Sequence, residues 1–186
     1  MIDIETLDTK ATSIIVSVGA VYFDLETGKL GDKFYAEVPV YDLEYQALKG
    51  RSFSFYTMSW WMSQGDEVRQ VFSEYRLNSE QTRVSSLDTI LKDLRFFIEG
   101  EPNIWANGSD FDSVILDNAF KMYGLETPWQ FYQNRCYRTV LNIGDNKKKG
   151  LPRDKTTHHN SLADADYQAR NLIHLIGGVM SHTRMS

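Results

Sequence analysis

The sequence predicts an α/β fold, in which a mixed β-sheet is covered by α-helices. Two observations support this class. Residues 1–40 read as consecutive strands joined by short links, which is typical of an antiparallel meander. Residues 85–176 instead alternate short strands with runs of helical periodicity, which places helices on the faces of a sheet. Because no segment has the composition of a linker, residues 1–186 are expected to form a single domain.

Side-chain patterns predict the N-terminal strands. At the start of the chain Ile2 and Ile4 lie on one face, and Asp3 and Glu5 lie on the other. The next run is rich in Ile and Val, so it is expected to be buried. The three strands are predicted at residues 1–5, 13–23 and 33–40.

Helical periodicity marks four later segments. The clearest of them carries an apolar stripe, and Ser85 with Asp88 resembles a capping box at its start. Helices are expected at residues 59–74, 85–99, 112–123 and 162–176, and short strands at 104–106 and near 136–141. The inward positions of the first helix are expected to be Trp61, Met62, Val68 and Phe72.

The composition indicates a folded intracellular protein. A hydrophobic fraction of 42% can supply a core, and the single cysteine, Cys136, cannot form an internal disulfide. No apolar run has membrane-spanning length and no leader is evident, so we expect a cytoplasmic protein without membrane partners. The net charge of −5 argues against a nonspecific nucleic-acid coat protein. It does not argue against an enzyme that holds metals with acids.

Acids stand at the ends of three predicted elements, and the first group is Asp3 with Glu5. Two carboxylates two residues apart on a strand project from one face, roughly 6–7 Å apart along the backbone. That spacing suits one divalent ion between them or two ions side by side. The alternative is a pair of solvated acids on an edge strand.

The second group lies in the turn from Asn107 to Asp112, between a short strand and a helix. Loops at the carboxyl ends of strands are where open α/β sheets bind ligands. The alternative is a helix start, because Ser109 or Asp110 would serve as an N-cap. A carboxylate at Asp112 would in any case favour the helix dipole.

The third group opens the last helix. Ser161 and Asp164 have capping-box spacing, which explains the acid without any metal. The cap does not explain His159, whose side-chain type has an unperturbed pKa of about 6.5 and can accept a proton at neutral pH. His158 is interpreted as a surface residue.

Taken in order, the three groups resemble the exonuclease motifs of the DnaQ-like (DEDDh) superfamily. The matching segments are Asp3-Ile-Glu-Thr6, Asn107-Gly-Ser-Asp-Phe-Asp112 and His159-Asn-Ser-Leu-Ala-Asp164. Residues 15–21, 60–64 and 105–108 look like the branch of that superfamily that contains the phage exonuclease DexA. The resemblance implies a ribonuclease H-like fold, with a mixed five-stranded sheet flanked by helices.

The resemblance implies a metal-dependent 3′→5′ exonuclease that releases nucleoside monophosphates. It assigns metal ligation to Asp3, Glu5, Asp112 and Asp164, and it makes His159 the general base. Two Mg²⁺ or Mn²⁺ ions, roughly 3.5–4 Å apart, would stabilise the attacking and leaving oxygens. Oxygen ligands favour these ions over zinc. Asp110 is a rival to Asp112, which is preferred because the aromatic Phe111 precedes it.

Substrate contacts are predicted around this site. The resemblance places Thr6 and Leu7 against the terminal nucleotide, although Leu7 is also explained as an apolar turn residue. Asn107 and Phe111 could bind substrate, and Asn107 could otherwise shape its turn. Residues 147–155 hold five cations against one acid, so Lys147, Lys148 and Lys149 could follow the phosphate backbone. A mobile, solvated loop is the alternative.

Several alternatives stay open. The expected substrate is the 3′ end of single-stranded DNA, with RNA as the rival, since no motif reads the 2′-hydroxyl. A catalytically silent nucleic-acid-binding module is a rival of another class. Trp60 and Trp61 cannot both enter one core, so one could stack on a base or join a homodimer contact. Only two residues precede Asp3, so the chain could start late within its first strand.

Overall fold

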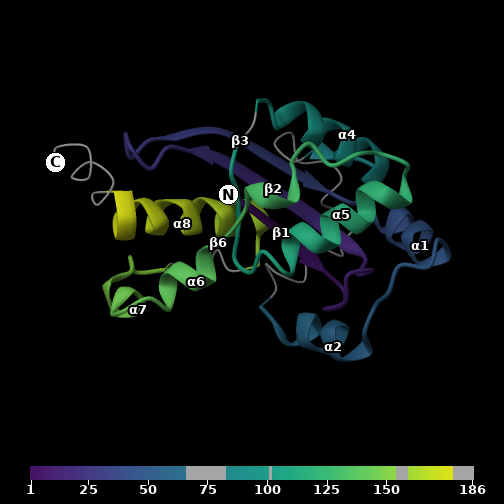
Figure 1. Cartoon of the computed structure of the whole chain (residues 1–186). Coiled ribbons are helices and arrows are strands. Elements are labelled where there is room, and N and C mark those ends of the chain that lie inside the picture. The colour runs from purple at the N-terminus through teal and green to yellow at the C-terminus, as the bar shows by residue number, and fades with distance from the viewer. Residues whose placement is uncertain (66–82, 101, 154–158, 178–186) are drawn as a thin grey trace, which may run out of the picture.

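The computed structural model describes residues 1–65, 83–100, 102–153 and 159–177. These residues form a mixed α/β structure, in which helices from the second part of the chain pack on strands from the first part (Figure 1). The predicted α/β class is therefore confirmed. The extent of the single domain, 1–186, stays a prediction.

The described strands form two hydrogen-bonded sheets. In the larger sheet β1, β2 and β3 form the predicted antiparallel meander, and β4 pairs in parallel with β3. In the smaller sheet β5 pairs in parallel with β6, and β5 lies beside β1. The strands are β1 Ile2–Thr6, β2 Ile15–Phe23, β3 Leu30–Glu37, β4 Arg83–Val84, β5 Ile104–Ala106 and β6 Asn134–Cys136. A single five-stranded sheet is not seen among them, since the short β5 makes no ladder with β1.

Helices occupy most of the remaining described chain. They are α1 Val40–Leu48, α2 Phe55–Ser63, α4 Leu87–Phe97, α5 Asp112–Met122, α6 Tyr137–Leu141, α7 Asn146–Lys149 and α8 Ser161–Leu172. A turn of π-helix, Ile173–Gly177, continues α8, and a short 3₁₀ turn covers Phe131–Gln133. The expected helices at 85–99, 112–123 and 162–176 are thereby confirmed within a few residues at each end.

Three boundaries differ from the prediction. The third strand ends at Glu37, because Pro39, which lacks an amide donor, precedes a helix that the sequence reading missed. Only Cys136 of the strand expected near 136–141 is extended, and helix α6 follows it. The helix expected at 59–74 begins earlier, at Phe55, where Ser54 accepts a hydrogen bond from the Thr57 amide. It ends at Ser63, where Gln64 adopts an extended conformation, and residues 66–74 of the expected helix fall outside the described residues.

Side-chain burial in α2 separates the two tryptophans. Trp61 is 1% exposed, whereas Trp60 is 38% exposed. Met62 is 52% exposed, so its predicted inward position is wrong. It lies one residue beyond Trp61, about 100° further around the helix, and so leaves the buried face. Val68 and Phe72 lie outside the described residues.

Helix α8 packs across β1, β2 and β3, and its start comes closest to the sheet at Gly19. A β-carbon built at Gly19 would lie 2.3 Å from the backbone nitrogen of Leu162. No side chain can occupy that space, so the main chain of the helix rests on the main chain of β2. Because Gly19 pairs with Asp3 across the sheet, this contact sets the helix beside the acidic face of β1.

Candidate active site

Strand β1 presents two faces, as its sequence predicts. Ile2 and Ile4 are buried in the core, and Asp3 and Glu5 project from the other face with partial exposure. Gln168 of α8 donates a hydrogen bond from its Nε2 to Asp3 Oδ1 over 2.7 Å. The position of the Asp3 carboxylate is therefore set by its strand and by a hydrogen bond from the helix that covers it.

Asp112 joins this face from the start of α5. Its side chain is 3% exposed, and its Oδ1 accepts a hydrogen bond from the Ile4 amide over 3.1 Å. Asp110 is exposed by contrast. The N-cap residue is Phe111, without a side-chain cap bond, so the capping alternative for Ser109 or Asp110 is wrong. The turn after β5 instead brings Asp112 to the middle of β1.

Asp164 lies in the first turn of α8, 8% exposed. The N-cap is Asn160, whose Oδ1 accepts from the Ala163 amide over 3.0 Å, so the predicted Ser161 capping box is wrong. Ser161 is buried and shares a hydrogen bond of 3.0 Å with Ser17 of β2. With the cap supplied by Asn160, Asp164 has no capping role, and it forms an ion pair with Arg153.

His159 lies directly before the cap of α8, with a φ of 66° that non-glycine residues rarely adopt. Glu5, His159 and Asp164 offer ligand atoms that all lie within 4.8 Å of one another, among the described residues. The ring of Trp60 meets the imidazole edge-on, with centroids 4.6 Å apart. Trp61 of the same helix donates from Nε1 to the Thr6 carbonyl over 3.0 Å, and this bond connects α2 to the end of β1.

Like charges and burial dominate the electrostatics of this group. Burial, and then the charges of Asp112, Glu5 and Asp164, raise the pKa of Asp3 well above its usual value. Burial, and then the charges of Asp164 and Asp112, raise the pKa of Glu5 to about 8, against the charge of Arg153, which lowers it. Burial raises the pKa of Asp112 to about 7, against the Ile4 hydrogen bond, which lowers it. Crowded carboxylates that resist ionisation favour a cation among them.

The inner face of α8 carries a row of polar residues that the sequence reading did not single out. Ser161, Asp164, Gln168 and Asn171 are all buried and are spaced by three or four residues, so they share one side of the helix. Each forms a side-chain hydrogen bond, and their partners are, in the same order, Ser17, Arg153, Asp3 and Tyr137. The sequence does contain a signal for this row, because its polar residues recur with a helical period on a helix that is expected to be buried.

The predicted substrate residues fall into two groups. Thr6 and Leu7 are buried, and the Thr6 hydroxyl donates to the Asp8 carbonyl over 2.9 Å. Phe111 is partly buried and packs against the core, and Asn107 is partly exposed beside a cavity. Their contacts with substrate stay predictions.

The basic segment is partly helical and is attached to α8. Lys147 and Lys149 are exposed on α7, and the side chain of Lys148 lies outside the described residues. Leu151 donates its amide to Asn171 Oδ1 over 2.6 Å and accepts at its carbonyl from the Tyr167 hydroxyl over 2.8 Å. Residues 146–149 are thus helical and Leu151 is bonded to α8, while the choice between a phosphate-binding segment and a solvated loop stays open.

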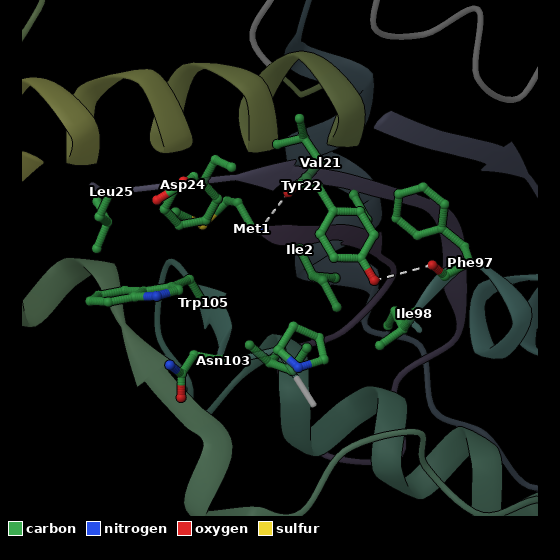
Figure 2. Close-up of a pocket in the computed structure, with 14 residues that line it drawn as sticks. Met1, Ile2, Val21, Tyr22, Asp24, Leu25, Phe97, Ile98, Asn103 and Trp105 are labelled. Carbon is green, nitrogen blue, oxygen red and sulfur yellow. Dashed lines mark hydrogen bonds between the residues drawn. The ribbon is translucent and has the colours of Figure 1, made fainter. Parts of the chain in front are cut away.

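A separate cavity of about 300 Å³ opens at the other end of β1. Figure 2 shows Met1, Tyr22 and Trp105 around it, with the Met1 amine donating to the Val21 carbonyl over 2.8 Å. The only carboxylate in its lining is Asp24, whose oxygens accept hydrogen bonds within its own turn. None of the four predicted metal ligands lines this cavity, so we do not place the chemistry there.

Among the described residues, no helix is long and apolar enough to cross a membrane. The fold and the site define an α/β protein that gathers four carboxylates and a histidine where β1, α5 and α8 meet. The chain belongs to the 3′-5′ exoribonuclease Rv2179c-like domain family, whose model matches residues 1–175. That is a family of 3′-5′ exonucleases, which act on nucleic acid. Among curated proteins, no match to the chain was found.

Proposed function

We propose that this protein is a metal-dependent 3′→5′ exonuclease of the DEDDh type, close to the DexA branch and built on a ribonuclease H-like fold. One observation carries the proposal. Asp3, Glu5, Asp112 and Asp164 come from three separate elements, yet they lie near enough that the charges of Asp112 and Asp164 raise the pKa values of Asp3 and Glu5. A protein without a use for that cluster would gain stability by replacing its members.

The donor set suits hard divalent cations. Glu5, His159 and Asp164 already place their ligand atoms within 4.8 Å of one another. Carboxylate oxygens are the ligands that Mg²⁺ and Mn²⁺ prefer. Asp3, Glu5, Asp112 and Asp164 would hold the ions, which when bound would neutralise charge that develops on the phosphodiester oxygens.

The side chains around the acids have distinct roles in this proposal. His159 accepts the proton of the attacking water, a role that typically contributes about 10²–10⁴-fold in rate. Trp60 packs against the imidazole and limits its rotation. Gln168 orients the Asp3 carboxylate through its hydrogen bond. Arg153 offsets the charge of Asp164 in the free protein.

The proposed substrate is the 3′ end of RNA. The sequence alone favoured single-stranded DNA, with RNA as the alternative, but the description of the family names an exoribonuclease. The 2′-hydroxyl is the group that distinguishes the two substrates. The homodimer and the cytoplasmic location stay predictions.

A single assay tests this proposal. Matched 5′-labelled RNA and DNA oligonucleotides are incubated with the protein in Mg²⁺, Mn²⁺ or EDTA. We expect a ladder shortened from the 3′ end with either metal, none in EDTA, and faster digestion of RNA. Thermal unfolding supplies a second readout, because metal should raise the midpoint of the wild type but not that of Asp3→Asn.

Each negative result has a defined meaning. Faster digestion of DNA would return the substrate to the first expectation. Binding without digestion in either metal would instead favour the silent binding module.

A further inference from the structure

A small polar cavity adjoins the candidate active site on the side of α7. It has a volume of about 220 Å³ and lies between α8 and residues 147–153. Two of its lining side chains also belong to the acidic cluster. Gln168 bonds Asp3 over 2.7 Å, and Arg153 forms an ion pair with Asp164. A ligand in this cavity would therefore lie directly beside the acids.

The lining of the cavity has the opposite charge to the site next to it. It contains the cations Lys147 and Arg153 and no Asp or Glu, although the chain as a whole carries a net charge of −5. Neutral donors join them, since Asn107 and the hydroxyl-bearing Tyr137 also line the space. The cavity lies below the roughly 300–1,000 Å³ typical of pockets for drug-sized ligands. Its size and charge suit a small anion.

Hydrogen bonds fix this cavity in place. Asn171 accepts from the Leu151 amide over 2.6 Å and donates to the Tyr137 hydroxyl over 2.5 Å. The guanidinium of Arg153 lies 5.1 Å from the centre of the Tyr167 ring. A preformed site of this kind loses little conformational entropy when a ligand binds.

We propose that this cavity binds a phosphate of the substrate strand other than the one that is hydrolysed, with Lys147 and Arg153 as its ligands. The proposal rests on the function proposed above. The guanidinium carries five N–H donors, so Arg153 can keep its bond to Asp164 while other donors face the phosphate. A strand held at both points would have its scissile phosphate fixed relative to the acids.

Methylphosphonate substitution tests the proposal position by position. Each oligonucleotide of a set carries one neutral linkage, and binding to the full chain is measured by fluorescence anisotropy in EDTA, where hydrolysis does not interfere. With the wild-type protein we expect one non-scissile position to weaken binding about 5–10-fold, the effect of one lost phosphate contact. With Lys147→Ala or Arg153→Ala, a neutral linkage at that position should weaken binding no more than one at the other positions. Lys92→Ala, which removes an exposed cation of α4 outside the lining, is the control.

Salt dependence gives an independent readout. The slope of log Kd against log salt should fall by roughly 0.7 in Lys147→Ala and stay unchanged in the control. Equal penalties at every linkage, an unchanged pattern in both variants, or no binding at all would overturn the proposal. If 3′ digestion with metal persists in that case, only the phosphate site is wrong, whereas absent digestion removes the proposed function as well.

Discussion

Helices α4 and α8 both pack on the larger sheet, but the buried residues of α4 are all apolar, whereas α8 buries polar side chains as well as apolar ones. The inner face of α4 consists of Leu87, Ile90, Leu91 and Leu94, each with 0% exposure. The inner face of α8 includes the row of buried polar residues around Asp164. Burying apolar surface stabilises a fold, whereas burying charge costs free energy unless partners compensate it.

The cost is visible in individual atoms of α8. Gln168 Oε1 is buried without a hydrogen-bond partner among the described residues, while its Nε2 is committed to Asp3. A buried unsatisfied acceptor typically costs about 1–3 kcal/mol. The comparison therefore teaches that α4 supports the structure, whereas α8 gives up stability to position chemical groups. Four substitutions test this division, one in α4 and three among the acids and the histidine that α8 helps to position.

The largest expected effect belongs to Asp3→Asn, which should lower the rate of 3′ digestion by at least about 10⁴-fold, beyond the loss of a general base. The amide keeps the volume of the side chain but removes a ligand charge from the face covered by α8. Rates are measured on labelled oligonucleotides in Mn²⁺, with Asp24→Asn in its exposed turn as the control. Activity at the wild-type rate would show that the acids hold no metal.

His159→Ala should lower kcat by about 10²–10⁴-fold. The proton acceptor is lost, while the four carboxylates remain in place. Single-turnover rates at several pH values provide the measurement, and His174→Ala, in the π-helical turn that follows α8, is the control. A loss confined to KM would assign His159 to substrate binding instead.

Leu91→Ala in α4 should lower stability and leave activity unchanged, unlike Asp3→Asn and His159→Ala. Removing a side chain with 0% exposure is expected to lower the free energy of unfolding by about 2–5 kcal/mol, because a cavity is left in the core. Activity per folded molecule should be unchanged. Urea unfolding and active-site titration measure the two quantities, with the 80% exposed Phe96→Ala as control. A strong loss of activity in the folded fraction would mean that α4 also positions the site.

The smallest expected effect is a gain. In EDTA, Asp112→Asn should raise the free energy of unfolding by a net amount on the order of 1 kcal/mol at pH 8, because the gain from removing a buried charge exceeds the loss from weakening the hydrogen bond from Ile4. The pKa of Asp112 is raised to about 7, so the native state binds its proton more tightly than the unfolded state. The gain should therefore grow as pH rises from about 4 and level off above about 7.

Urea unfolding across that pH range checks the sign. The control is Asp117→Asn, which changes a partly exposed acid of the same helix that pairs with Lys121. A loss of stability at pH 8 would mean that Asp112 contributes more through its bond to Ile4 than it costs through its charge.

Local patterns in the sequence predicted part of this site well. Strict alternation in β1 separated Asp3 and Glu5 from the core, and the helix start at residue 112 followed from periodicity. Long-range partners could not be predicted this way. Gln168 meets Asp3 across 165 residues of chain, and Trp60 meets His159 only because Trp61 ties α2 to β1. The division into two sheets also depends on how β5 approaches β1, which no local pattern encodes.

The backbone contact between Gly19 and the start of α8 bears on which substitutions the core can accept. Because main chain meets main chain there, the separation between β2 and the start of α8 does not depend on the volume of any side chain. Changes elsewhere in the core can be absorbed by repacking without altering that separation. The residue that sets the geometry of the acids is thus one with no side chain, and a single added methyl group would shift the whole helix.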